Sequence, residues 1–179
     1  SEEACPLDLA PTTSTTAALA LGDALAVALL EAKNFKSDDF AKSHPGGKLG
    51  KRLITTVDDL MSKGKDLPIV TKETSLSETL IEISSKGLGV ALVVNKNKLL
   101  GIFTDGDLRR TLNNEKDPLN KDIQSFMTQK SKTIQKDCLA IEALEIMQNN
   151  SIYSLAVLDK KHVPVGVIRM HDLIEAGLV

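Results

Sequence analysis

The sequence predicts an α/β fold in which two copies of a β-α-β-β-α module follow a helical segment. The stretch 101–108 (GIFTDGDL) recurs at 166–173 (GVIRMHDL), an offset of about 65 residues. This offset is longer than the repeats of solenoid proteins, so it predicts two modules rather than an array. The chain also changes character near Leu53, from Ala-rich helical sequence to alternating strand-like and helix-like segments. We therefore expect three parts, at residues 1–53, 57–113 and 123–179.

The first part predicts helices followed by a glycine-rich loop. From about Thr15 to Lys33, Ala and Leu occupy nearly every face of the expected helix, and a helix that is apolar all round is normally buried. Its apolar run at 17–30 is interrupted and is shorter than the ~20 residues of a bilayer span, so we expect no membrane partner. A second short helix is expected at 37–42 and a loop at 43–50, where one proline and three glycines oppose regular structure. The long helix packs either on the second part or, as we favour, on a larger body outside this sequence.

Both modules are expected to contain the same elements in the same order. Each opens with a short helix and a brief strand, continues with an amphipathic helix, and ends with a β-hairpin and a final helix. The small sheet of each copy has one open apolar face, so two copies bury these faces against each other. The elements are expected at 58–61, 68–70, 76–86, 90–94 and 99–104 with a helix from Asp105, and at 123–127, 133–134, 140–149, 154–158 and 163–169 with a helix from His171.

Composition and charge oppose several classes of partner. The net charge is -2 with 26% charged residues of both signs, so no basic face that would neutralise nucleic-acid phosphates is expected. Only 3% of residues are aromatic and tryptophan is absent, which disfavours the base-stacking platforms of nucleic-acid binders. Cys5 and Cys138 lie far apart without a metal-binding spacing, so we expect no metal and a reducing, cytoplasmic environment. The N-terminus has no signal-peptide pattern.

The repeated stretch and the element order around it resemble cystathionine β-synthase (CBS) domains. Such domains occur in tandem and commonly bind adenosyl or other nucleotide ligands between the two copies. The resemblance implies a nucleotide site at Thr104 and Asp107, where the carboxylate accepts hydrogen bonds from both ribose hydroxyls and the threonine adds a contact. The alternative is that Asp107 caps the final helix, because a carboxylate in the first turn is favourable in any case.

The second copy departs from this pattern. Arg169 stands where the first copy has the threonine, whereas Asp172 is retained. This puts an ordinary adenosine site in doubt, and an arginine suits a phosphate or a carboxylate instead. The alternative is an arginine at the surface end of a strand.

The first part resembles the end of a sugar isomerase (SIS) domain. The stretches 10–16, 22–26 and 43–50 (SHPGGKLG) are similar to those of bacterial D-arabinose 5-phosphate isomerases, which carry an SIS domain followed by a CBS pair. The resemblance implies that this chain is the C-terminal half of such an enzyme. It also implies conversion of D-ribulose 5-phosphate to D-arabinose 5-phosphate for the Kdo sugar of the outer surface, without a cofactor. We expect a homo-oligomer, a dimer of CBS pairs that becomes a tetramer in the full-length enzyme.

Three residues of the first part are candidates for the sugar-phosphate site. The isomerisation moves a proton between adjacent carbons, and histidine is the side chain whose ordinary pKa suits this near neutral pH. By resemblance the catalytic histidine is His44, although its partners lie outside this sequence; a lone loop histidine can also be simply solvated. Ser14 and Thr15 lie at a helix start, where free amides favour an anion, although helix capping explains them equally well.

Three functions therefore stay open from the sequence. The first is part of an arabinose 5-phosphate isomerase whose CBS pair senses a nucleotide or a nucleotide-activated sugar. A CMP-linked sugar acid would suit feedback control, because Arg169 could meet its carboxylate. The second is a non-catalytic nucleotide-binding module, and the third is a module that only assembles subunits.

Overall fold

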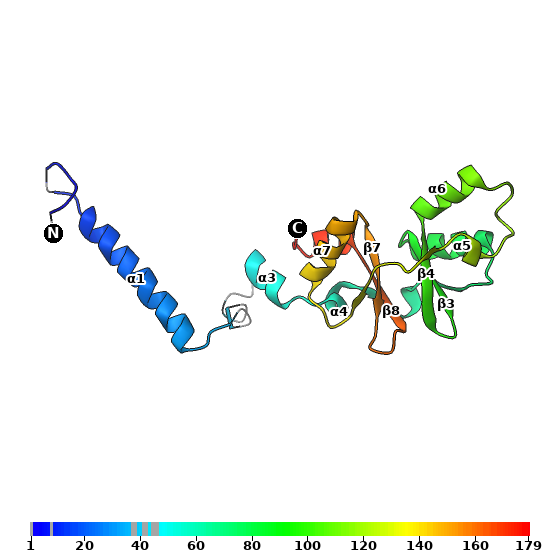
Figure 1. Ribbon diagram of the computed structural model, residues 1–179, viewed down its shortest axis with the longest axis horizontal. Coiled ribbons are helices and arrows are strands. Elements are labelled where there is room, and N and C mark those ends of the chain that lie inside the picture. Colours follow the sequence, from blue (N-terminus) through cyan, green and yellow to red (C-terminus); the bar gives the residue numbers. More distant parts are fainter. Residues whose placement is uncertain (1, 8, 37–38, 41–42, 44–46) are drawn as a thin grey trace. The chain divides into compact units, whose positions relative to one another are not determined.

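The computed structural model describes residues 2–7, 9–36, 39–40, 43 and 47–179, which form two compact units (Figure 1). The first unit is Ser1–Gly46 and the second is Gly47–Val179. The second unit contains both repeats. Because the units are separate bodies, each is described on its own.

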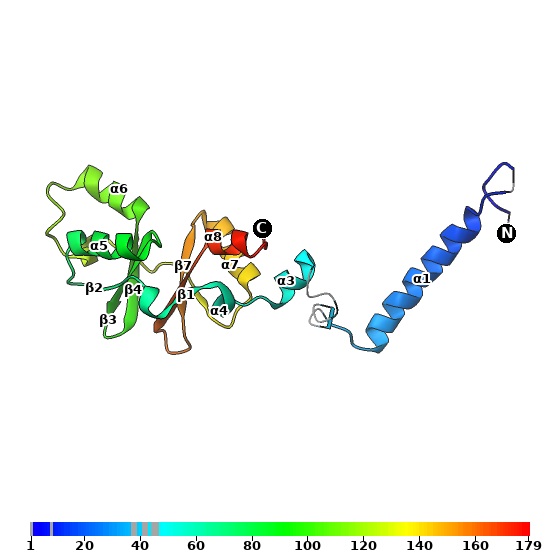
Figure 2. The ribbon, with the colours of Figure 1, turned by 180° about the vertical axis from the view of Figure 1, so that it is seen from behind.

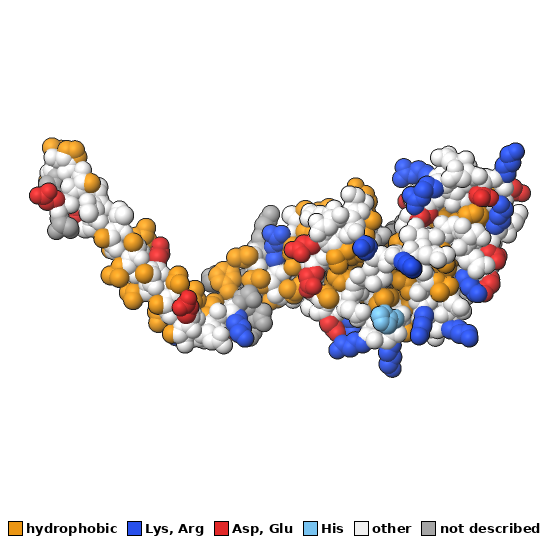
Figure 3. Space-filling view, viewed as in Figure 1, with side chains coloured by type: hydrophobic (Ala, Val, Ile, Leu, Met, Phe, Trp, Pro, Cys, Tyr) orange, Lys and Arg blue, Asp and Glu red, His pale blue; other side chains and the backbone are white. Residues whose placement is uncertain are grey.

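The first unit is built around one long helix, α1 (Thr13–Ala32), whose residues are all exposed. Figure 3 shows apolar side chains along its length. Leu19, Leu25 and Leu29 are each more than half exposed. Burial of this helix on a larger body outside this sequence, which the sequence favours, stays a prediction. Gly22 and Asp23 do not break the helix, which is 20 residues long. Among the described residues it is the one helix long and apolar enough to cross a bilayer by length and composition, a test that core helices of soluble proteins also pass.

A short helix, α3 (Lys48–Ile54), opens the second unit where we expected the end of a loop. Gly47 has extended backbone and precedes the helix, and Lys51 and Arg52 lie in its last turn, where cations favour the helix dipole. The glycine at position 50 is thus accommodated inside a helix. The central residues of the expected loop, 44–46, and most of the short helix expected at 37–42 lie outside the described residues.

Two four-stranded sheets form the framework of the second unit (Figure 1). In each sheet a parallel pair and an antiparallel hairpin are followed by one further short strand. The first sheet has the order β2 (Ile69–Thr71), β3 (Val90–Asn95), β4 (Lys98–Thr104) and β5 (Thr128–Gln129). The second has the order β6 (Thr133–Gln135), β7 (Ser154–Leu158), β8 (Pro164–Arg169) and β1 (Ser62–Lys63).

Helices accompany each sheet much as the sequence predicts. The amphipathic helices begin behind an N-terminal hydrogen bond: the Ser75 amide donates to Glu78 in the first module, and the Leu139 amide donates to Glu142 in the second. The helices of the first module are α5 (Leu76–Lys86) and α6 (Asp105–Asn114); those of the second are α7 (Ala140–Asn150) and α8 (Met170–Glu175).

The leading segments of the two repeats are exchanged, which the sequence did not indicate. Helix α4 (Val57–Leu60) and strand β1 open the first repeat, yet they lie beside the elements of the second module (Figure 2). Strand β1 pairs with β8, and Val57 lies in the second module's core. The leading segment of the second repeat behaves reciprocally, since β5 pairs with β4 and Ile123 lies in the first module's core. The helix expected at 123–127 is only a 3-10 turn, η2 (Ile123–Ser125), because the chain then extends into β5.

The two modules share a layer of apolar side chains, as the open faces of the repeats predict. Val90 and Leu92 of β3 pack in one cluster with Ala156 of β7 and Val167 of β8, and each of these four is at most 2% exposed. Exchange and shared core together hold the repeats as one body.

Candidate ligand-binding cleft

A cleft of about 1010 Å³ lies between the two modules. Both modules line it through the beginnings of α6 and α8 and the residues before β3 and β7, and the single segment between β5 and β6 adds to the lining. Its size is at the upper end of the range in which proteins bind small molecules and cofactors. Of the four candidate nucleotide-binding residues, Thr104, Asp107 and Arg169 line the cleft, whereas Asp172 is not among its lining residues.

Asp107 is buried at the start of α6 and its carboxylate accepts four hydrogen bonds. The backbone amide and the hydroxyl of Thr104 donate to Oδ2 over 2.9 and 2.7 Å. The hydroxyl of Thr128 donates to Oδ1 over 2.7 Å, and Arg110 donates to the same oxygen. Asp107 therefore caps the helix and also ties the exchanged strand β5 to the first module. The capping role weighed from the sequence is present, and a ligand that uses this carboxylate must share it with these donors.

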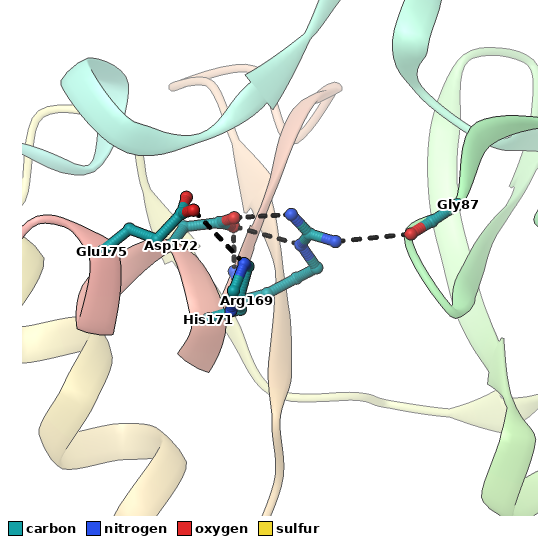
Figure 4. A network of polar contacts seen from close by, with 5 residues as sticks. All are labelled: Gly87, Arg169, His171, Asp172 and Glu175. Carbon is teal, nitrogen blue, oxygen red and sulfur yellow. Dashed lines mark hydrogen bonds and ion pairs between the residues drawn. The ribbon is translucent and has the colours of Figure 1, made fainter.

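The equivalent carboxylate of the second module is held by an arginine (Figure 4). The Arg169 amide donates to Asp172 Oδ2 over 2.8 Å, and its guanidinium donates to both carboxylate oxygens, over 3.3 Å from Nε and 2.6 Å from Nη2. Hydrogen bonds to Asp172 raise the pKa of Arg169, so the guanidinium stays charged. Its Nη1 reaches the carbonyl of Gly87 in the first module over 3.3 Å. Arg169 thus joins the second module to the first and is not simply a surface residue at a strand end.

Cationic side chains dominate the charge around the cleft. Five of the described lining residues are Lys or Arg and two are carboxylates, one of which is the fully engaged Asp107. Excess positive charge in a concave site raises the local concentration of anions. The cleft is therefore suited to a ligand that carries phosphate groups. The cationic residues are Arg109, Arg110, Lys130, Lys132 and Arg169.

Sequence reasoning missed several of these lining residues. Lys130 and Lys132 lie between the exchanged strand β5 and strand β6, and no local pattern marks them, because their place depends on the exchange. Tyr153 was also missed, although its side chain is 77% exposed at the cleft. It is the single tyrosine of the chain and stands just before a buried strand, a signal that could have been noticed.

The candidate sugar-phosphate residues of the first unit do not form a site among the described residues. His44 lies outside the described residues. At the start of α1, the amides of Thr12 and Ser14 donate to the carboxylate of Glu3, over 2.7 and 3.3 Å. Hydrogen bonds from Ser14 and Thr12 lower the pKa of Glu3 to about 2. A carboxylate of the same chain thus occupies the place where the sequence predicts an anion.

Comparison with known proteins identifies the repeats. A family model for the CBS domain matches residues 57–114 and again residues 121–178. The chain belongs to the CBS domain family. The solved CBS domain pair of protein MJ0100, in complex with 5'-methylthioadenosine and S-adenosyl-L-methionine, superposes with a TM-score of 0.60. It is 25% identical in sequence and covers 68% of this chain and 98% of its own.

Two curated relatives extend the similarity to the first unit. Arabinose 5-phosphate isomerase KdsD from Pseudomonas aeruginosa is 52% identical over 179 residues, which are 99% of this chain and 55% of that protein. The protein of the same name from Escherichia coli K12 is 48% identical over 179 residues, 99% of this chain and 54% of its own. The chain thus spans about half the length of the curated relatives it matches, and it corresponds to their C-terminal half.

Proposed function

We propose that the CBS pair is the regulatory part of an arabinose 5-phosphate isomerase and binds a nucleotide or a nucleotide-activated sugar in its cleft. The observation that carries the proposal is the cleft itself, a concavity of about 1010 Å³ with five cationic side chains beside two helix N-termini. Helix N-termini and Lys or Arg side chains are the groups that hold phosphates in proteins. The adenosine derivatives in complex with the MJ0100 pair support a related class of ligand.

The geometry favours a ligand with more negative charge than a nucleoside. Arg109, Lys130 and Lys132 form no ion pair among the described residues, so phosphates can bind them without displacing a protein carboxylate. Arg169 is different, because a phosphate or a sugar-acid carboxylate must compete there with Asp172. A CMP-linked sugar acid remains a candidate on this ground, together with the common adenine nucleotides.

The catalytic part of the proposal rests on the isomerases that the chain resembles. By that resemblance, the complete protein converts D-ribulose 5-phosphate to D-arabinose 5-phosphate, a precursor of the Kdo sugar, in the cytoplasm. His44 would serve as the acid or base, and Ser14 and Thr15 would approach the substrate. The test is the full-length enzyme with His44→Ala, which should lose nearly all turnover while binding nucleotide normally. Full turnover in that variant would refute the assignment of His44.

The sensor function is tested by thermal unfolding of the chain with AMP, ADP, ATP, CMP and a CMP-sugar. A ligand present at 100 times its dissociation constant adds about 2.7 kcal/mol to the unfolding free energy, which appears as a higher midpoint temperature. Lys132→Ala should weaken the effect, because the side chain lines the cleft. Lys160→Ala is the matched control, because it removes the same side chain outside the cleft. The Lys160 side chain is 88% exposed and lies beside Asp137.

An assembly module without a ligand is the second candidate. The outer helices expose single apolar side chains, Ile81 on α5 at 67% and Leu112 on α6 at 54%, that a second copy could cover. A dimer of CBS pairs, within a tetramer of the complete enzyme, is the arrangement we expect. If none of the five ligands raises the midpoint while the chain forms a dimer by light scattering, assembly replaces sensing as the function.

A further inference from the structure

Residues 55–57, where the chain enters the second unit, are fastened to residues 138–140 by an antiparallel bridge. The Ala140 amide donates to the Thr55 carbonyl over 2.8 Å, and the Val57 amide donates in the opposite direction over 2.9 Å. We call this pairing the entry clip. It ties α3, whose C-cap is Thr55, to the beginning of α7, and α3 also contacts α7 directly.

The first module has an equivalent clip, but that clip holds a different part of the chain. There the Leu76 amide donates to the Lys121 carbonyl over 3.0 Å. The Ile123 amide donates in the opposite direction over 2.8 Å, so α5 is tied to the chain that arrives from α6 of the same module. The exchange of the leading segments thus attaches the chain from the first unit to the second module. In sequence, α3 follows the stretch 43–47, which contains His44.

Helix α7 reaches from the entry clip to the cleft. Its last residue, Asn150, and the two residues that follow it line the cleft. The Ile152 amide donates to the Met147 carbonyl over 3.0 Å, so this part of the cleft wall is bonded back onto the last turn of the helix. The helix has 11 residues. An α-helix of that length spans roughly 16 Å, which is the distance between the clip and the cleft along its axis.

The helix between these two ends is packed into the core of the second module. Ala140, Ala143 and Met147 are completely buried, and Leu144 is 3% exposed. A close-packed core transmits a displacement instead of absorbing it, because it has few voids into which side chains can relax. A shift of α7 at the cleft therefore reaches the entry clip.

We propose that α7 transmits the presence of a ligand in the cleft to the first unit, through the entry clip and α3. This inference rests on the proposed sensor function and adds to it the route by which a bound nucleotide changes turnover. A ligand that contacts residues 150–152 favours one position of α7, and the clip passes this position to α3. The ligand must bind the two positions with different affinities, because a ligand that binds both equally shifts nothing.

The parent chain provides a test that needs no variant. Saturation with ATP or CMP, followed by calorimetry, should shift the NMR resonances of the Val57 and Ala140 amides, although both amides belong to the clip and neither residue lines the cleft. The Lys161 amide, in the hairpin between β7 and β8 and also outside the cleft, should keep its resonance. Unchanged resonances of Val57 and Ala140 in the nucleotide-bound chain would overturn the proposal.

A proline at position 140 should break the clip with little other change. Proline fits the first residue of a helix, provided that the residue before it is extended. Ala140 is the first residue of α7, and Leu139 before it has φ -69° and ψ 143°. Ala140→Pro therefore removes the amide that donates to Thr55, whereas the matched control Ala140→Gly keeps it. Val57→Pro, at the first residue of α4, removes the second bond of the clip.

Both proline variants should uncouple the two ligand sites of the full-length enzyme. In the parent enzyme, D-arabinose 5-phosphate should change the nucleotide affinity measured by calorimetry about 5- to 150-fold, the usual size of coupling between two sites. In the proline variants this factor should fall to within about twofold of one, and turnover should no longer respond to nucleotide. Nucleotide affinity without the sugar phosphate should stay near that of the parent, because the clip lies outside the cleft.

Failure of this inference and failure of the sensor function give different results. If nucleotide changes the turnover of the parent and the folded proline variants respond equally, transmission through the clip is refuted and the sensor function stands. If Ala140→Gly uncouples the sites as strongly as Ala140→Pro, the hydrogen bond to Thr55 is not the route. If the proline variants unfold at a much lower temperature, the amide resonances of the parent chain decide. If no nucleotide binds the parent chain, both proposals fall together.

Discussion

The two modules place a carboxylate at the same point of the repeat and hold it in different ways. In the first module Asp107 is 4% exposed and accepts bonds from its own helix start and from Thr128 of the exchanged strand. In the second module Asp172 is bonded by Arg169, whose guanidinium continues to Gly87 of the other module. One repeated position thus holds an exchanged strand in one copy and a contact between the two modules in the other.

This difference shows how a duplicated module can divide its tasks. Helix capping needs only a carboxylate three residues after the last strand residue, and both copies keep it. The residue at the strand end is then free to change, from Thr104 to Arg169. The arginine gives the second module a charged group at the cleft without loss of the cap.

Removal of the two carboxylates should give the largest change in the free energy of unfolding. Asp107→Ala leaves four donors without their acceptor, so the unfolding free energy should fall by about 3 kcal/mol. Asp172→Ala loses only the bonds from Arg169, whose guanidinium is partly solvated, and should cost about 1 kcal/mol. Urea unfolding of both variants gives the comparison. Equal losses of unfolding free energy would show that the hydrogen bond from Thr128 to Asp107 does not stabilise the exchanged strand.

The glycines that admit the exchanged strands should also differ between the modules. A Cβ at Gly101 would overlap the backbone carbonyl of Thr128, which cannot move without shifting β5, so Gly101→Ala should cost about 2 kcal/mol. At Gly166 the overlap is with the flexible side chain of Met61, with Cγ at 2.9 Å, and Gly166→Ala should cost about 1 kcal/mol. Thermal unfolding measures both, and a reversed order would mean that β1 is the more rigid partner.

Capping of the amphipathic helices gives a smaller difference. In the first module the Glu78 amide donates to the Ser75 hydroxyl over 3.2 Å, a bond that Leu139 cannot provide in the second module. Ser75→Ala should therefore lower the unfolding free energy by about 1 kcal/mol. Leu139→Ala removes no cap and serves as the matched variant. The two helices would be equally dependent on their caps if Ser75→Ala had no effect on the urea midpoint.

The smallest effect is on acid stability. Hydrogen bonds from Thr56 lower the pKa of Asp59, and hydrogen bonds from Ser75 lower the pKa of Glu78. A carboxylate whose pKa is lower in the folded state stabilises the fold above its unfolded pKa, and this stability is lost as the pH falls through the folded value. The midpoint temperature should thus decline below about pH 4.5. Glu78→Gln should flatten the decline slightly, and an identical pH profile would exclude a contribution from this cap.

The sequence predicted some residues of the candidate site, but not the two lysines that lie beside them. Thr104, Asp107 and Arg169 follow from the repeat and lie at the cleft, whereas Asp172 faces Arg169 instead. Lys130 and Lys132 reach the cleft because the chain between β5 and β6 passes from one sheet to the other. Their position depends on pairing between residues far apart in sequence, which leaves no periodic signal. Whether these residues bind a ligand stays a prediction.

The sequence by itself determined the number of modules and the order of their elements, and it offered the helix cap at Asp107 as one reading of that residue. These features depend on spacings of two to four residues. Side-chain periodicity and helix capping act over such short spacings, so the sequence alone indicates them. Only the tertiary structure decided that β1 and β5 change places, that Arg169 reaches Gly87 and that Tyr153 stays exposed. The physical reason is that both sheets offer equivalent edges to both leading segments. Packing of Val57 and Ile123 into the opposite cores selects between those edges, and a local pattern does not record that choice.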